Sequence, residues 1–198
     1  MHTQKKKKII GIDLDDVLLD FNPTLYAWHN ATYGTSFEHK DVTSYFIEDI
    51  WKCTRAEAVA KIVDFYLTDE HKNALPVSGA VQGIERLRKN HSLILVTSKP
   101  DYLRPLTVKW LEKHFPAMFQ SIHFTNHWLG DKNKRRTKSE LCRRLGIQVF
   151  VEDGPAHALD VATVCEQVFL FNRPWNQMEV FPPIVRVSSW EDIVQKLQ

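Results

Sequence analysis

The sequence predicts an α/β fold, in which a Rossmann-like parallel sheet carries helices on both faces and a small helical cap is inserted after the first strand. Three observations lead to this prediction. Short runs of branched apolar residues recur along the chain, helical patterns separate most of them, and one long stretch after the first run contains no convincing buried strand.

Six apolar runs have the length and composition of buried strands. They cover residues 8–13, 93–97, 122–125, 149–152, 168–171 and 185–187. Nearly continuous apolar strands are typical of parallel sheets that are covered on both faces. The helical patterns that cover the sheet span residues 81–89, 102–113, 138–145 and 156–164, and residues 190–197 form a closing helix.

In the segment of residues 21–76, aromatic and polar residues alternate irregularly, and residues 55–67 show helical periodicity. We therefore predict a helical cap over residues 21–76 and a catalytic core formed by residues 1–20 and 77–198. In open α/β sheets the ligand lies outside the carboxyl ends of the strands. A segment inserted after the first strand would hang over that place.

Composition limits the classes of function. The 198 residues carry a formal net charge of +2, which gives no general attraction to nucleic acid or to a membrane surface. No apolar stretch approaches the ~18 residues needed to cross a bilayer, and the apolar segment near the N-terminus is interrupted by Asp13. The three cysteines form no CxxC pair. We expect a cytoplasmic protein without a nucleic-acid or membrane partner, and the oligomeric state stays open.

Four acidic residues crowd the end of the first predicted strand, in the stretch "IIGIDLDDVLLDF" (residues 9–21). They are Asp13, Asp15, Asp16 and Asp20. Neighbouring carboxylates repel each other and are costly to bury unless a positive group neutralises them. Asp13 and Asp15 are therefore expected to bind a cation and take part in chemistry. Asp16 and Asp20 are expected to cap the helix that follows.

Other predicted strands end in complementary groups. The run "LILVTSKP" ends in Thr97 and Ser98, "VFVEDGP" ends in Glu152 and Asp153, and Lys138 opens the helix before the second of these runs. Carboxylates, hydroxyls and a lysine together suit phosphoryl transfer. A carboxylate can attack phosphorus, a divalent cation can neutralise the repulsion, and the hydroxyls and the lysine can hold the phosphate oxygens.

The order of these groups resembles the haloacid dehalogenase superfamily, whose members are mostly phosphatases. "DLDDVL" matches its DxDx[TV] signature, and Thr97, Lys138 and "ED" at 152–153 stand where its later motifs stand. The resemblance implies that Asp13 is the nucleophile and Asp15 the general acid. It also implies that Mg²⁺ is held by Asp13, Asp153 and the main-chain carbonyl of Asp15.

Within that superfamily the inserted segment resembles the small helical caps of the 5′(3′)-deoxyribonucleotidase branch. The stretches "KDVTSYF" (residues 40–46) and "TVKWLEKHF" (residues 107–115) also resemble that branch and its bacterial relatives. This chain departs from that branch at two places. Asp16 stands where the deoxyribonucleotidases commonly have Gly, and "TSKP" stands where they usually have Thr-Ser-Pro. The resemblance implies a nucleoside monophosphate as the substrate. Phe21, Tyr45 and Phe46 are candidate substrate-binding residues, beside Thr97, Ser98 and Lys138, although such aromatics also build cap cores.

Several alternatives remain open from the sequence alone. The substrate could be another small phosphorylated metabolite, such as a sugar phosphate, or the chain could be a non-catalytic binding protein that keeps the fold. Glu152 could tune the metal through water or pair with a lysine. Lys132 and Lys134 compete with Lys138 for the phosphate role, and the basic loop 132–138 could be a solvated loop or attract an anionic substrate.

Overall fold

In the computed structural model, which describes residues 7–127 and 132–197, six parallel strands form one sheet in the order β3-β2-β1-β4-β5-β6. The strands are β1 (Ile9–Ile12), β2 (Ser92–Thr97), β3 (Ser121–Phe124), β4 (Val149–Glu152), β5 (Gln167–Phe171) and β6 (Ile184–Val187). The predicted Rossmann-like sheet is therefore confirmed. Residues 1–6, 128–131 and 198 of the predicted core lie outside the described residues.

The helices predicted by their ranges are present with small shifts at their ends, among the nine α-helices of the described residues. They are α1 (Phe21–Tyr33), α2 (Ile47–Trp51), α3 (Arg55–Leu67), α4 (Asp69–Lys72), α5 (Ala80–Leu87), α6 (Arg104–His114), α7 (Lys138–Leu145), α8 (Pro155–Ala162) and α9 (Trp190–Leu197). Short 3-10 helices are η1 (His39–Asp41), η2 (Asp101–Leu103), η3 (Lys132–Lys134) and η4 (Pro174–Asn176). None of the helices in the described ranges is long and apolar enough to cross a membrane.

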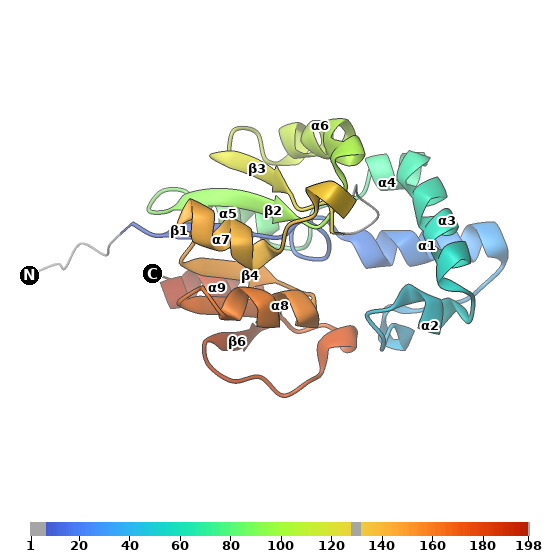
Figure 1. The fold of residues 1–198 in the computed structure, drawn as a ribbon. Helices are drawn as coiled ribbons and strands as arrows, with labels where there is room; N and C mark the ends of the chain where they lie inside the picture. Colours follow the sequence, from blue (N-terminus) through green and yellow to red (C-terminus); the bar gives the residue numbers. More distant parts are fainter. Residues whose placement is uncertain (1–6, 128–131, 198) are drawn as a thin grey trace, which may run out of the picture.

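Two apolar cores lie on the two faces of the sheet, and helices cover the sheet on both sides (Figure 1). Helices α5, α6 and α9 bury their apolar sides on one face, and α7 and α8 bury theirs on the other. Alternate residues of each strand point to opposite faces, so Ile10 and Ile12 of β1 enter the first core. Between them Gly11 faces the second core, where an added Cβ would lie only 2.5 Å from the ring of Phe150. A larger residue would not fit at this position.

The segment between β1 and α5 is helical, as predicted. Its helices α1 to α4 pack against one another and lie beyond the carboxyl ends of the strands (Figure 1). Aromatic rings form much of the contact between them: Phe65 of α3 lies 5.6 Å from Phe21 and 5.4 Å from Trp28, measured between ring centroids. The segment thus has its own small aromatic core, continuous with the larger core of the sheet.

The chain enters and leaves this helical segment through two short stretches of backbone, at residues 18–20 and 75–77, that lie side by side. The amide of Asp20 donates to the carbonyl of Leu75 at 3.0 Å, and the amide of Val77 donates to the carbonyl of Leu18 at 2.7 Å. The two crossings are therefore joined to each other by backbone hydrogen bonds at a single place.

The prediction that two acids cap the helix after the first strand is half right. Asp16 Oδ1 accepts the amide of Asn22 in the first turn of α1 at 2.9 Å. Asp20 stands at the N-cap position itself, but its side chain makes no capping hydrogen bond. The chain turns sharply at Asp16, where φ is 54°, and this turn brings the earlier carboxylate within reach of the helix.

Candidate active site

The carboxyl ends of the central strands bring the predicted site residues together. Asp13 directly follows β1, Thr97 ends β2, and Glu152 ends β4 with Asp153 after it. Strand order reverses between β1 and β4, the place where open α/β sheets bind their ligands. The amide of Asp13 donates to the carbonyl of Val151 at 3.0 Å, which fixes the start of the first acidic loop against β4.

Lys138 reaches this place from the first turn of α7. The helix begins with a capping box, in which the side chain of Thr137 accepts the amide of Glu140 and the side chain of Glu140 accepts the amide of Thr137. The Lys138 ammonium lies 2.7 Å from Asp13 and 2.7 Å from Glu152. Its side chain is only 1% exposed. Burial alone would lower the pKa of Lys138, but these two carboxylates raise it above its ordinary value.

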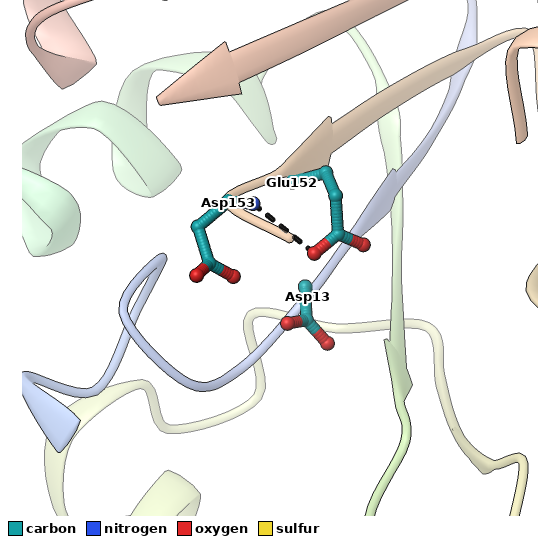
Figure 2. A group of neighbouring side chains, drawn as sticks. All are labelled: Asp13, Glu152 and Asp153. Carbon is teal, nitrogen blue, oxygen red and sulfur yellow. Dashed lines mark hydrogen bonds between the residues drawn. The ribbon is translucent and has the colours of Figure 1, made fainter. Parts of the chain in front are cut away.

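Glu152 pairs with a lysine, which is one of the two roles considered for it. Its Oε2 lies against Lys138, and its Oε1 accepts the amides of Asp153 at 3.1 Å and Gly154 at 3.0 Å. Figure 2 shows the Glu152 carboxylate turned toward Asp13 and bound to the amide of Asp153. Both oxygens of Glu152 are thus engaged by the protein itself.

Asp13 and Asp153 are the two carboxylates best placed to hold a cation. One oxygen from each of Asp13, Glu152 and Asp153 lies within 4.8 Å of the others. Burial raises the pKa of Asp13 and raises that of Asp153 well above its usual range, the neighbouring carboxylates adding to the effect. Lys138 compensates one of these three carboxylate charges and leaves the other two without a cationic partner in the cluster. The remaining carboxylate oxygens fit Mg²⁺, a hard cation that prefers oxygen ligands.

Trp175 holds the Asp153 carboxylate in place. Its indole N–H donates to Asp153 Oδ2 at 2.9 Å, and the side-chain amide of Asn176 donates to the Asp153 carbonyl. Both donors belong to η4, which follows β5. Donors that orient a carboxylate in this way support a metal ligand from outside its coordination sphere.

Asp15 faces a second buried lysine. The Lys99 ammonium lies 3.0 Å from Asp15 Oδ1, and the Lys99 side chain is 3% exposed. Burial raises the pKa of Asp15, whereas the positive charge of Lys99 opposes that rise. Asp13 and Asp15 therefore each have a separate lysine as counter-ion.

The two hydroxyls at the end of β2 take different partners. Thr97 is buried, and its Oγ1 accepts the amide of Lys99 at 3.2 Å. Ser98 Oγ lies 3.2 Å from Nε2 of His157 on α8. Burial lowers the pKa of His157 to about 3, and Lys138 adds to this effect. At neutral pH His157 is therefore an uncharged partner for Ser98.

One pocket of about 470 Å³ extends from the acidic residues after β1 to the helical segment between β1 and α5. Its floor includes Asp13, Asp15, Thr97, Ser98 and Asp153, and its walls include Phe21, Tyr45, Phe46, Ile62 and Tyr66. The three predicted aromatics differ in their settings. Phe21 is buried against Phe65 and Tyr66, whereas Phe46 is 54% exposed. Tyr45 approaches the backbone of Gly154, where an added Cβ would lie 3.2 Å from its ring.

Several residues that the structure places at the site were absent from the sequence prediction, among them Lys99, Trp175 and His157. The signal for Lys99 was its place directly after Thr97 and Ser98. No comparable signal marks Trp175, because its contact with Asp153 depends on how the chain folds back after β5. The prediction favoured Lys138 over Lys132 and Lys134. The structure places Lys138 beside the carboxylates and Lys134 is exposed, whereas the side chain of Lys132 lies outside the described part of the structure.

Comparisons with known proteins place the chain among nucleotidases. The family model described as 5′ nucleotidase, deoxy (pyrimidine), cytosolic type C protein (NT5C) matches residues 7–198. A 5′(3′)-deoxyribonucleotidase of Bacillus subtilis is 28% identical over 194 residues, which cover 96% of this chain and 99% of the relative. A nucleotidase of Clostridium acetobutylicum is 25% identical over 188 residues, covering 93% and 90%.

Solved structures share the fold at low sequence identity. A haloacid dehalogenase-like family protein from Streptococcus pneumoniae superposes with a TM-score of 0.71 at 14% identity, covering 97% of this chain and 99% of the other. YfnB from Bacillus subtilis, solved bound to magnesium, superposes with a TM-score of 0.64 at 15% identity, covering 98% and 99%.

Proposed function

The chain belongs to the NT5C family of 5′-nucleotidases, and from this premise we propose that it is a magnesium-dependent phosphomonoester hydrolase that acts on nucleoside monophosphates through an aspartyl-phosphate. The proposal keeps the predicted division of labour. The sheet supplies the chemistry, and residues 21–76 form a cap that selects the substrate. The expected cytoplasmic location stays a prediction.

One observation carries the proposal. A single continuous pocket has the carboxylates of Asp13 and Asp15 at its floor and the exposed ring of Phe46 in its wall. A phosphate ester can reach the carboxylates while a flat apolar group lies against the cap. A nucleoside monophosphate combines such a group with a phosphate in one molecule.

In the proposed reaction Asp13 attacks phosphorus, and the bond between phosphorus and the ester oxygen breaks. Asp15 gives its proton to the departing alcohol oxygen. It then takes a proton from the water that attacks the aspartyl-phosphate, which releases inorganic phosphate and restores Asp13. Lys138, Thr97 and Ser98 hold the non-bridging oxygens as charge builds on them.

Asp13, Asp153 and the carbonyl of Asp15 would hold Mg²⁺, which when bound neutralises the repulsion between the attacking carboxylate and the phosphate. Glu152 fits a different task, because its oxygens already bind Lys138 and two backbone amides. It fixes the orientation of Lys138 toward Asp13.

The test is the release of inorganic phosphate by the purified protein from ribo- and deoxyribonucleoside 5′- and 3′-monophosphates, sugar phosphates and an aryl phosphate, with Mg²⁺ or with chelator. We expect a nucleoside monophosphate to be the best substrate and chelator to abolish turnover. Asp13→Asn keeps the size of the side chain but removes the attacking charge, so turnover should fall by at least about 1,000-fold while the fold survives.

Each part of the proposal can fail separately. Near-normal turnover by Asp13→Asn would exclude Asp13 as the nucleophile, and turnover unaffected by chelator would exclude the metal. A sugar phosphate as the best substrate would leave the chemistry intact and reject the nucleotide assignment. A protein that hydrolyses none of these esters would instead support the non-catalytic alternative.

A further inference from the structure

Beyond the proposed function, and resting on its assignment of Asp15 as the acid, we infer that Lys99 is a positioning residue that holds the Asp15 carboxylate and links its placement to the cap. Lys99 follows β2, Asp15 follows β1, and the rings beside Lys99 come from the helical segment. Three separate parts of the chain therefore meet at one ammonium group.

The Lys99 ammonium lies in a cage made by one carboxylate and two aromatic rings. It is 3.0 Å from Asp15 Oδ1, 4.5 Å from the ring centroid of Tyr66 and 5.0 Å from that of Phe21. A cation over a ring face within about 6 Å is attracted to it, more strongly where water is excluded. The rings thus replace part of the hydration that the buried lysine loses.

The cage also directs the Lys99 ammonium toward Asp15 and away from a direct contact with the substrate. The Lys99 side chain is 3% exposed, and the carboxylate beside it already supplies a compensating charge. A lysine that binds phosphate directly needs its donors turned toward the ligand. Lys138 has that position at the floor of the site, beside the proposed nucleophile Asp13.

Holding Asp15 by Oδ1 leaves its second oxygen, Oδ2, for the departing alcohol. A carboxyl group free to rotate would present either oxygen, and small misplacements of an acid reduce catalysis strongly. Phe21 and Tyr66 belong to α1 and α3. The acid is therefore in place only while these two cap rings enclose Lys99.

The experiment measures the first chemical step, release of the alcohol with formation of the aspartyl-phosphate, in pre-steady-state reactions of four proteins on a nucleoside monophosphate and on 2,4-dinitrophenyl phosphate, whose leaving group needs little protonation. The first step is followed because the second, hydrolysis of the aspartyl-phosphate with Asp15 as the base, is the same for both esters. The proteins are wild type, Lys99→Met, Asp15→Asn and the double variant. Methionine is one atom shorter than lysine, carries no charge and suits the aromatic cage. Lys109→Met is the matched control, because Lys109 is an exposed lysine on α6 away from the pocket.

We expect Lys99→Met to lower the rate of the first step on the nucleotide by about 100-fold, within the range that a placed general acid contributes. The same variant should lose less than about threefold in that rate on the dinitrophenyl ester, with the half-saturating substrate concentration nearly constant for both. The double variant should be no slower than Asp15→Asn, because both changes remove one function. Lys99→Arg, which keeps the charge, repeats the test if the methionine variant does not fold, with a loss of about 10-fold confined to the nucleotide.

A higher half-saturating substrate concentration with an unchanged rate of the first step would show that Lys99 binds substrate. Equal losses of that rate on both esters, or additive losses in the double variant, would show a role independent of Asp15. Either result overturns the inference while the proposed function stands. If wild type hydrolyses neither ester, or Asp15→Asn itself loses both equally, the failure lies in the proposed function and removes the basis of the inference.

Discussion

Asp153 receives a hydrogen bond from a ring that lies outside the cluster of acids. The indole N–H of Trp175 donates to Asp153 Oδ2, which leaves Oδ1 as the oxygen free for a cation. An acid held in this way loses little freedom when the ion binds. The strength of metal binding should therefore depend on Trp175, although its own side chain donates no metal ligand.

Trp175→Phe keeps an aromatic ring but removes the N–H. We expect the Mg²⁺ concentration that gives half of the thermal stabilisation to rise by about 10-fold, the lower end of what such supporting contacts contribute. The measurement is the unfolding temperature across a Mg²⁺ titration, which needs no turnover.

Trp110→Phe is the matched control for this change. Its indole N–H donates to the carbonyl of Ala74 at 2.7 Å, away from the acids. Both variants should lose some stability, but only the one at Trp175 should shift the Mg²⁺ dependence. Equal shifts in both proteins, or none in either, would contradict a supporting role for Trp175.

The sequence predicted the site residues that directly follow strands. It did not predict the site residues that later parts of the chain bring back to the ends of those strands. Asp13, Thr97 and Asp153 could be placed together because parallel strands end at one edge of the sheet. Trp175 could not, because only the path of the chain after β5 brings it to Asp153. Lys99 stood in the right stretch, but the two rings that make its burial possible come from distant helices.

Two helices with the same start perform different tasks. Thr54 caps α3 and Thr137 caps α7, each in a capping box with the glutamate three residues later. The first helix lines the cap side of the pocket with Ala58 and Ile62, and the second carries Lys138 in its first turn. Under the proposed function, the same substitution at each N-cap should therefore affect substrate selection in one helix and chemistry in the other.

Thr54→Ala and Thr137→Ala should each lower the free energy of unfolding by about 1 kcal/mol, the usual effect of losing an N-cap. Denaturant unfolding measures this loss. Thr137→Ala should also lower kcat several-fold on every substrate, because Lys138 is less firmly held. Thr54→Ala should raise KM for the nucleotide only. Reversed effects on kcat and KM would reject this division between the two helices.

The elements themselves were largely predictable, because buried strands and amphipathic helices leave strong periodic signals. The helical character of residues 55–67 was visible in this way, and α3 covers the same residues. The short helices α2 and α4 were not predicted individually. Segments of four or five residues are too short to show a period, and tertiary contacts decide their conformation.

Across the whole molecule the proposed cap and the sheet divide the pocket between them. Tyr45 reaches the backbone of Gly154, and the ring of His39 lies 5.7 Å from that of Trp175. Residues of the helical segment thus contact both the loop after β4 and Trp175, the residue that orients Asp153. Under the proposed function, the sheet carries the chemistry common to all phosphate esters, and the helical segment, which faces the rest of the substrate, discriminates among them.

Phe46→Ala should raise KM for the nucleotide by about tenfold, equivalent to ~1.4 kcal/mol, because stacking on a base contributes roughly 1–3 kcal/mol. Its ring is exposed in the pocket wall, so removing it should disturb the fold little. Turnover of a small aryl phosphate should stay nearly unchanged. Kinetics on both substrates decide the question, and a parallel loss would mean that Phe46 supports the cap instead of the base.

The paired crossings between β1 and α5 have a consequence for how such proteins diversify. Because Leu18 and Asp20 on the way out are hydrogen-bonded to Val77 and Leu75 on the way back, the two ends of the segment between them lie at one place on the sheet. The length and sequence of this segment can change, or a different module can take its place, while the sheet and its acids keep their positions. Substrate range can then evolve by exchange at this junction, without a change in the catalytic machinery.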